Sequence, residues 1–457
     1  MPLVLGVDSS MGATTVELRD ADDGRVYGSG RAIHPDGTAP GEQDPAVWWQ
    51  ALVEARHDAG GALGVAAVGA AAQQPGLVAI DGDGKLLRPA LVGHAGAAVG
   101  DARRLEEIMG PSEWVAACGS VPSSALPIAK LAWMQRKEPD AFARISWVLQ
   151  PHDWLTLRLS RQIVTDRGGA SGTGYWSPRE ERWRTDLLEL VADDRDWEQC
   201  VPTVVAPHEP AGDREGVLIA AGTGQPMATA LGLALEPGDV VVDTGGAVYA
   251  VRERPTEDPS GVVSGYADAT GRFLPLVETI DAVKASDHIA GLLGLERSRF
   301  DQLVSSAPAG ARGLVFVPPL ADGRPGELRG IRGDTDAEDV ARATLEGVAC
   351  ALLNAIDSLR GADVPVGGQL FLVGHGARMH ALAQVLADVG ERVVSVPKGE
   401  RSASGACVQA AAALRDTPPD EVARAWGMHE ARPVEPDPRI DGGEIRATHR
   451  DATHSAF

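Results

Sequence analysis

Positive charge is scarce in this 457-residue chain. It carries 42 Lys and Arg residues against 64 Asp and Glu residues, which gives a formal net charge of −22 at pH 7. Such a balance repels the phosphates of nucleic acids and the anionic head groups of lipids. We therefore expect neither nucleic acid nor a membrane surface as a partner.

Long apolar runs and closely spaced cysteines are also absent. No apolar run approaches the roughly 20 residues that span a bilayer, and the N-terminus lacks the basic region that opens a signal peptide. The cysteines lie far apart, at Cys118, Cys200, Cys350 and Cys407. Without CxxC or Cys/His spacing they form neither a zinc site nor a disulfide framework. We expect a cytoplasmic protein whose cysteines are small buried thiols.

Several motifs that would define another enzyme class are missing. The sequence has no nucleophile elbow, no Walker lysine loop and no dinucleotide-binding glycine fingerprint.

Its length suits two domains of roughly 200 residues each, because single hydrophobic cores stop growing near about 250 to 300 residues.

Two stretches with the same strand, turn and strand plan lie about 235 residues apart. The apolar run 3–7 ends at Asp8 and is followed by a small-residue turn and the alternating TTVELRD, which predicts a β-hairpin with Asp8 at its tip. The run VVV likewise leads into the turn 243–246 and then AVYAV. Helical periodicity at 45–59 and 336–360 adds helices to both halves and indicates an α/β fold.

The chain resembles the FGGY carbohydrate kinases, and specifically the xylulokinases, over roughly residues 3 to 428. The matching segments follow in order: GEQDPAVWWQAL (41–52), LRPALV (87–92), LPIAKLAWMQRKEP (126–139), LQPHDWLTLRLS (149–160), TDRGGASGTGYW (165–176), AAGTG (220–224), VGHGAR (373–378) and SGACVQAAA (404–412). The resemblance implies two ribonuclease-H-like domains of the actin, hexokinase and Hsp70 type with an interdomain cleft. We expect a sugar-side domain at 1–227, a nucleotide-side domain at 228–428 and a peripheral or disordered polar tail at 429–457.

The stretch 217–251 resembles the family's hinge, but its catalytic residue differs. Where the family has Gly-Asp-Asn-Ala, this chain has Gly224, Gln225, Pro226 and Met227. The family aspartate takes the proton of the sugar hydroxyl, and an amide cannot accept it near neutral pH. The general-base contribution of roughly 10²- to 10⁴-fold should then be lost. We predict an impaired enzyme, a pseudokinase, with a helix that still begins near Pro226.

The resemblance also marks residues that would hold ATP and Mg. In the first hairpin Asp8 is a candidate for a magnesium-bound water, or alternatively a structural turn residue, and Ser10 and Gly12 are candidates for phosphate contacts. Met11 replaces the family's threonine, and Thr15 occupies its basic position. The nucleotide-side candidates are Thr244, Gly245, Gly246, Gly374, Gly376 and Ala377. Asp243 adds a carboxylate beside the phosphates, which should weaken their binding.

The expected sugar-binding residues are Gln74, Pro75, His94 and Gln225. Gln74-Pro75-Gly76 stands where the family has Gln-His-Gly, and His94 lies near its Trp-Asn-Asp position. Because fewer polar groups remain to pair with the hydroxyls, we do not expect a ketopentose in the family's usual pose.

Three polar side chains, His94, Asp243 and His375, stand where the family has none. If they converge they can act as acid, base or metal ligand. The alternative is that they are solvated loop residues, and His375 can also stack on an adenine.

Three hypotheses for the function of the chain follow. The chain is a regulatory subunit beside an active paralogue, or an active kinase for a sugar or polyol with another base such as Asp243, or a repurposed enzyme that uses these three residues. A homodimer is compatible with each.

Overall fold

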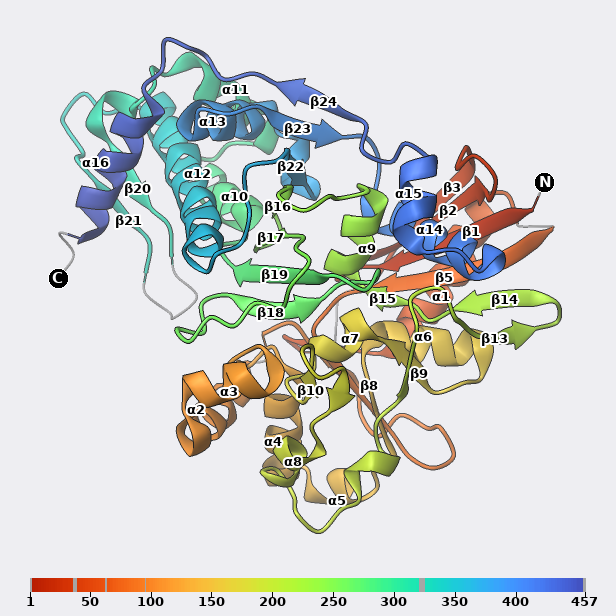
Figure 1. Ribbon diagram of the computed structural model, residues 1–457. Helices are drawn as coiled ribbons and strands as arrows, with labels where there is room; N and C mark the ends of the chain where they lie inside the picture. Colours follow the sequence, from red (N-terminus) through yellow and green to blue (C-terminus); the bar gives the residue numbers. More distant parts are fainter. Residues whose placement is uncertain (1, 36–38, 62–63, 95, 320–324, 455–457) are drawn as a thin grey trace. The chain divides into compact units, whose positions relative to one another are not determined.

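The computed structural model describes residues 2–35, 39–61, 64–94, 96–319 and 325–454 (Figure 1). The chain forms two compact units. The first unit comprises Met1–Leu235, Glu253–Leu274 and Glu400–His429, and the second comprises Glu236–Arg252, Pro275–Gly399 and Glu430–Phe457. These bounds differ from a single division near residue 227, because the chain returns to the first unit twice after leaving it.

The main sheet of the first unit is built around β1 (Leu3–Ser9) and β5 (Val65–Ala72), which run parallel. Its strand order is β13 (Pro210–Arg214), β14 (Val217–Ala220), β5, β1, β2 (Ala13–Asp20) and β3 (Val26–Ile33), and β15 (Thr223–Gly224) also pairs with β5. The predicted first hairpin is confirmed as β1 and β2. Asp8 lies inside β1, opposite Thr15, and the turn itself is formed by residues 10–12.

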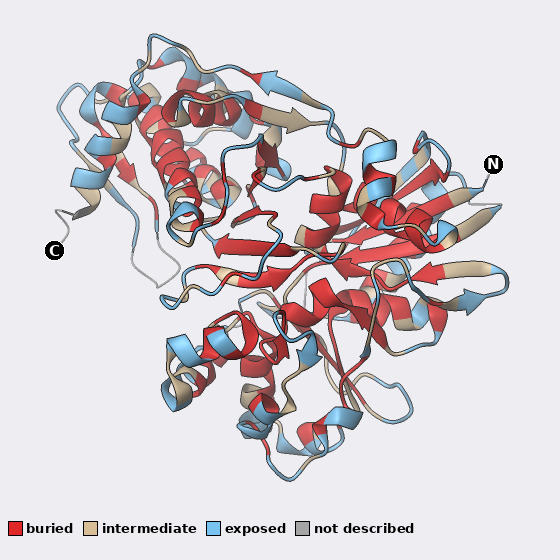
Figure 2. Cartoon of the chain, viewed as in Figure 1, coloured by how far each residue is buried: buried red, intermediate tan, exposed pale blue. Residues whose placement is uncertain are grey.

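Helices cover this sheet where its small and β-branched residues are buried. The predicted helix at 45–59 is confirmed as α1 (Pro45–Asp58), which packs on β2 and β3. α14 (Arg401–Arg415) packs on β1 and β5, and against α9 (Gln225–Gly232). Strands β1, β2 and β5 and the facing sides of these helices are largely buried (Figure 2).

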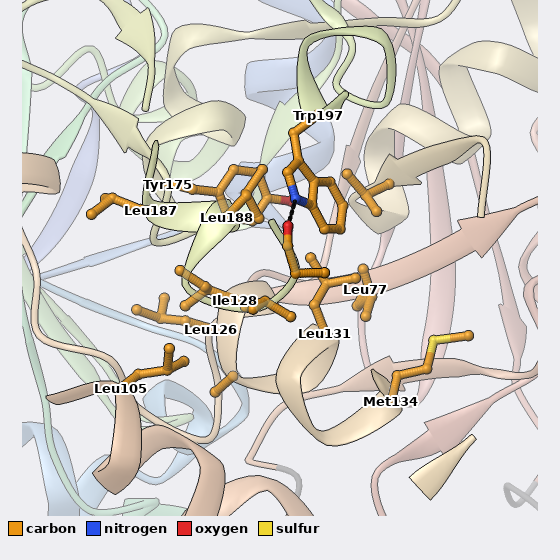
Figure 3. Close-up of a cluster of buried hydrophobic side chains, with 14 of the residues drawn as sticks. Leu77, Leu105, Leu126, Ile128, Leu131, Met134, Tyr175, Leu187, Leu188 and Trp197 are labelled. Carbon is orange, nitrogen blue, oxygen red and sulfur yellow. Dashed lines mark hydrogen bonds between the residues drawn. The ribbon is translucent and has the colours of Figure 1, made fainter. Parts of the chain in front are cut away.

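A second core of the first unit packs on one face of a smaller sheet with the order β4 (Glu42–Gln43), β7 (Ala90–Val92), β6 (Gly76–Ile80) and β8 (Trp147–Leu149). Figure 3 shows its apolar side chains, which gather around Leu131 and Trp197. The buried Trp197 indole donates to the Ala192 carbonyl at 2.8 Å, so the buried N–H has a partner.

Short elements complete the first unit. They are η1 (Gly96–Ala98), α2 (Val99–Met109), α3 (Pro111–Cys118), α4 (Pro127–Lys137), α5 (Pro139–Ala143), α6 (Pro151–Ser160), β9 (Val164–Asp166), α7 (Arg167–Ser171), β10 (Trp176–Ser177), β11 (Arg182–Trp183), α8 (Thr185–Glu189), η2 (Trp197–Gln199), β12 (Thr203–Val205), β18 (Ser264–Ala267) and α15 (Pro419–Ala425). Several begin with proline, whose fixed φ and missing N–H suit the first helical turn.

The second unit contains the second predicted hairpin, which is confirmed as β16 (Val240–Asp243) and β17 (Ala247–Ala250). The strand order is β19 (Phe273–Glu278), in which the chain passes from the first unit to the second, then β17, β16, β22 (Leu370–Val373), β23 (Val394–Pro397) and β24 (Ala431–Val434). The other elements are α10 (Ala282–Leu292), α11 (Arg297–Ser306), η3 (Ala311–Gly313), β20 (Val315–Val317), β21 (Glu327–Arg329), α12 (Ala337–Gly361), η4 (His375–Arg378), α13 (His380–Gly390) and α16 (Gly442–His454).

The long helix predicted at 336–360 is confirmed as α12. Asp336 caps it by accepting the N–H groups of Glu338 and Asp339, and Asp339 completes a capping box. Its heptad-like apolar positions, among them Leu345 and Leu352, are buried.

The tail predicted as peripheral or disordered at 429–457 contains a strand and a helix, and its strand β24 lies at the edge of the sheet. β24 pairs antiparallel with β23, and α16 packs on α12, α13 and β20. The polar composition gave no indication of β24 because this strand is held by backbone hydrogen bonds, which do not require apolar side chains.

The four cysteines are free and buried, as predicted. Burial raises the pKa of Cys118 to about 11 and that of Cys350 to about 12, so these thiols are unreactive at neutral pH. Within the described ranges, no helix is both long and apolar enough to cross a bilayer.

Candidate active site

Three strands of the first unit end at one edge of its sheet. β1 and β15 both run parallel to β5, and the register aligns Asp8 and Thr223 with the same residue, Ala71. The carboxyl ends of parallel strands are where open α/β sheets bind ligands. The fold therefore brings Asp8, Gln74 and Gln225 together from distant parts of the sequence.

Asp8 and Gln225 are in direct contact. Asp8 is buried, and Gln225 is the first residue of α9, whose predicted start is confirmed. The Gln225 Nε2 donates to Asp8 Oδ2 at 3.3 Å. The Gln225 side chain thus presents a hydrogen-bond donor to the Asp8 carboxylate.

Gln74 is held between two glycine segments. Its Nε2 donates to the carbonyls of Gly168 and Gly169 at 3.1 and 3.4 Å. Its Oε1 lies against Gly224, where an added Cβ would stand 1.3 Å from that oxygen. This Oε1 is buried and has no hydrogen-bond partner among the described residues, so Gln74 retains an acceptor at the sheet edge.

The sugar-side loop also contacts a lysine that sequence reasoning did not single out. The Gln74–Pro75 peptide is cis, and the Pro75 carbonyl accepts from Lys130 Nζ at 3.3 Å. Lys130 is fully buried on α4. Its place in an apolar helix pattern favoured a core position and gave no signal of this contact.

The turn of the first hairpin is held by its own hydrogen bonds. The Ser10 hydroxyl donates to the Ala13 carbonyl at 2.9 Å, and the Met11 carbonyl accepts from Gln43 Nε2 at 2.6 Å. The Met11 side chain is half exposed, and Gly12 has open space around its Cα.

A cation stands beside the position where the family has a basic residue. Arg31 on β3 is directly opposite Thr15 in the sheet, and its Nη1 lies 3.4 Å from Thr15 Oγ1. Arg31 also pairs with Glu400 at 3.5 Å. This contact could not be predicted from the sequence because cross-strand register is not a local property.

A buried charged cluster lies close to the loop that precedes α9. His152 Nε2 is 2.9 Å from Asp153 Oδ1 and 4.0 Å from Asp166 Oδ1. Burial raises the pKa of Asp166 to about 6, although the His152 ring and the Thr223 hydroxyl oppose this shift. Burial by itself would lower the pKa of His152, but Asp153 and Asp166 outweigh it and the pKa is raised.

In the second unit the predicted nucleotide-side residues lie on two neighbouring loops. β16 runs parallel to β22 with Asp243 opposite Val373, so the turn 243–246 adjoins the loop 374–378. The Thr244 hydroxyl donates to the Val373 carbonyl and accepts the Gly376 N–H, both at 3.0 Å. Gly374 has a φ of 85°, and a Cβ there would stand 2.6 Å from the Thr244 hydroxyl oxygen.

Most predicted phosphate-binding N–H groups of this unit already have acceptors. Asp243 Oδ1 accepts the Gly245 N–H at 2.9 Å, and the Asp243 carbonyl accepts that of Gly246 at 3.1 Å. The Ala377 N–H donates to the Gly374 carbonyl at 3.1 Å. The loops therefore have the expected backbone shape, but several of their donors are used internally.

The three additional polar residues are distributed over both units. His94, in the first unit, is exposed, and its Nδ1 lies 3.5 Å from the Ser124 hydroxyl. Asp243 and His375 lie on the adjoining loops of the second unit. In the described part of the chain, no group of three or more His, Cys, Asp or Glu residues is arranged to hold a metal ion.

The fold and these strand-end loops define a carbohydrate kinase family. Residues 13–232 match the N-terminal domain of the FGGY family of carbohydrate kinases, and residues 239–414 match its C-terminal domain. The chain belongs to the FGGY family, and the predicted family and α/β fold class are confirmed.

Within this family the chain is xylulokinase-like. It is 39% identical to the xylulose kinase of Streptomyces coelicolor over 448 residues, which is 93% of this chain and 91% of that protein. It is 29% identical to the crystal structure of xylulose kinase from Bifidobacterium adolescentis, with a TM-score of 0.83 and 99% of both chains covered. A ligand-bound xylulose kinase structure from Lactobacillus acidophilus, at 20% identity and a TM-score of 0.88, shares the fold.

Proposed function

We propose that this protein is a xylulokinase-like FGGY member in which phosphoryl transfer to a ketopentose or polyol hydroxyl is impaired. The contact between Gln225 and Asp8 carries the proposal. An aspartate at this position would accept the acceptor hydroxyl's proton, whereas the amide nitrogen of Gln225 only donates and its oxygen is a negligible base near pH 7. The expected loss is about 10²- to 10⁴-fold in rate.

The nucleotide loops support a reduced affinity for the family's cofactors, ATP and Mg. Phosphates are held by N–H groups that lack other acceptors, but those of Gly245, Gly376 and Ala377 are used internally. The Asp243 carboxylate adds like-charge repulsion. Asp8 and Arg31 still provide a carboxylate and a cation in the first unit. Because the residues fit the cofactors only in part, we assign no catalytic step through them.

Without a general base at position 225, the residues at the sheet edge can still bind a ligand. Gln74 Oε1 retains an unused acceptor there, and Gln225 and Asp8 hold one another in place. We infer that the protein acts as a regulatory or partner subunit of an active carbohydrate kinase, in the compartment where that kinase works.

Restoring the aspartate tests the proposal. Wild type, Gln225→Asp and the matched amide control Gln225→Asn are assayed with Mg-ATP, D-xylulose and a panel of polyols. We expect Gln225→Asp to raise the turnover rate at least about 100-fold over both amide forms. Wild-type turnover near about one per second, within the usual enzyme range, would overturn the proposal.

Two alternatives give different results in the same assay. An active kinase that uses Asp243 as its base would turn over as wild type and lose activity in Asp243→Ala. A repurposed enzyme that uses His94, Asp243 and His375 would show no ATP-dependent turnover in any variant, and Gln225→Asp would leave it inactive with sugars. Rescue by Gln225→Asp argues against both.

A further inference from the structure

A cavity of about 450 Å³ lies in the second unit, and the residues that line it belong to neither of the loops 243–246 and 374–378. It is lined by residues of α11, α12, α13 and the segment between β24 and α16, helices that pack on one another and are labelled in Figure 1. Its volume falls in the range of about 300 to 1,000 Å³ that is typical of small-molecule sites.

One wall of the cavity carries an arginine with unused donors. Arg342 on α12 is only 6% exposed. Its Nε donates to Glu346 Oε1 at 2.7 Å, while its Nη2 is buried and has no acceptor among the described residues. A buried donor without an acceptor is destabilising, so an oxyanion delivered by a ligand would be stabilised here.

A carboxylate of opposite charge lines the same cavity. Asp388 on α13 is 2% exposed, and its Oδ1 accepts from Gln384 Nε2 and from the Asp437 N–H at 2.8 and 2.9 Å. Both of these bonds go to one oxygen. No ion pair joins Asp388 to Arg342, although both residues are described and both line the cavity. The two charged groups therefore line the same cavity without a direct ion pair between them.

The remaining charges exclude a simple anion as the preferred ligand. The lining carries two arginines, Arg342 and Arg439, against two aspartates, Asp388 and Asp437, and Arg439 is paired with Asp437 at 2.6 Å. The cavity therefore has no excess of positive charge to attract phosphate. The rest of its lining is largely short and apolar: Val304, Ala307, Ala309, Ala381, Val385 and Ile440.

We propose that this cavity binds a small zwitterion, an α-amino acid with a short aliphatic side chain. The carboxylate is bound by the Arg342 guanidinium, whose planar fork suits it, and the ammonium by Asp388. The aliphatic side chain packs against the apolar lining. This site is independent of the phosphoryl-transfer chemistry and of the sugar-side residues.

Calorimetric titration of the full chain with L-valine tests the proposal. Two matched probes each lack one feature: 3-methylbutanoate has no ammonium, and 2-methylpropylamine has no carboxylate. A third probe, inorganic phosphate, lacks both the ammonium and the aliphatic part. We expect L-valine to bind, and each probe to bind at least about tenfold more weakly. Failure of L-valine to bind, or equal binding of the butanoate or phosphate, would overturn the proposal that the ligand is a zwitterion.

Variants locate the binding in this cavity. Asp388→Asn keeps an oxygen for Gln384 and Asp437 but removes the charge, so L-valine affinity should fall at least about tenfold. Ala309→Trp, at an exposed lining position, should block the cavity without disturbing the core. Arg179→Ala, in the first unit and with a side chain that is 64% exposed, should bind as wild type. An unchanged L-valine affinity in Ala309→Trp would show that the ligand does not bind in this cavity, even if Asp388→Asn failed to fold.

Discussion

The hairpins β1–β2 and β16–β17 share one backbone plan but use their acidic residues differently. In the first, Asp8 accepts a hydrogen bond from Gln225, which belongs to α9. In the second, Asp243 accepts the N–H of Gly245, two residues further along its own turn. With the same strand, turn and strand arrangement, the Asp8 carboxylate accepts a hydrogen bond from a helix distant in sequence, whereas the Asp243 carboxylate accepts one from its own turn. Shared backbone shape does not determine the chemistry.

The surroundings of the two hairpins differ in charge as well. The loop that leads to Gln225 lies near His152 and Asp166, which are buried and titratable. The second hairpin is braced by the neutral hydroxyl of Thr244. We therefore expect the neighbourhood of the first hairpin to respond to pH, and that of the second to respond to changes in backbone shape.

The largest effect should come from Asp166→Asn. The pKa of Asp166 is raised from 3.8 to about 6 in the folded protein, so its stabilising contribution is present below about pH 4 and is lost as pH rises towards 6. The raised pKa of His152 acts in the same direction. Relative to Asp166→Asn, the wild-type free energy of unfolding should fall by about 3 kcal/mol between pH 4 and 7. Denaturant unfolding at each pH measures this, and parallel profiles would contradict it.

The second prediction contrasts the two turns through matched glycine substitutions. Gly246 has a φ of 116°, which an L-residue rarely adopts, whereas Gly12 has an ordinary φ and open space. Gly246→Ala should lower the free energy of unfolding by about 1 to 3 kcal/mol. Gly12→Ala should leave it within about 1 kcal/mol of wild type. Equal destabilisation of both variants in urea unfolding would show that the turns are equivalent.

The third prediction concerns charge in the second turn. Asp243→Asn keeps an oxygen that can accept the Gly245 N–H but removes the negative charge. Because the carboxylate repels phosphate, we expect the affinity for Mg-ATP to rise by about tenfold, or about 1.4 kcal/mol. A thermal-shift titration measures this through the mass-action stabilisation of the fold. Weaker binding in Asp243→Asn would mean that the carboxylate helps to hold a metal.

The smallest effect should come from Arg31→Ala in the first hairpin. Its ion pair with Glu400 is 3.5 Å long and partly exposed, and such pairs contribute at most about 1 kcal/mol. The free energy of unfolding should change by no more than this, with Glu400→Ala as the control for the same pair. A loss of Mg-ATP affinity in Arg31→Ala alone would show that Arg31 contributes to nucleotide binding.

Local pattern predicted what depends on local contacts. Alternation over residues 3–20 and helical periodicity over 336–360 identified β1, β2 and α12, because burial of one face shows directly in residue order. The tail escaped prediction because β24 depends on pairing with β23. Arg31 and Lys130 escaped for the same kind of reason, since each meets its partner across a strand or helix packing contact.

By itself, the sequence determined the family, the two hairpins, the buried thiols and the absence of an aspartate at position 225, since these depend on residue identity and short-range spacing. Tertiary structure decided which groups each polar atom meets. It placed the Gln225 amide on Asp8, the Gly245 N–H on Asp243, and Arg342 and Asp388 on one cavity without pairing them. Hydrogen bonds and ion pairs act over a few ångströms, and residues far apart in the chain come within that range only through the packing of strands and helices.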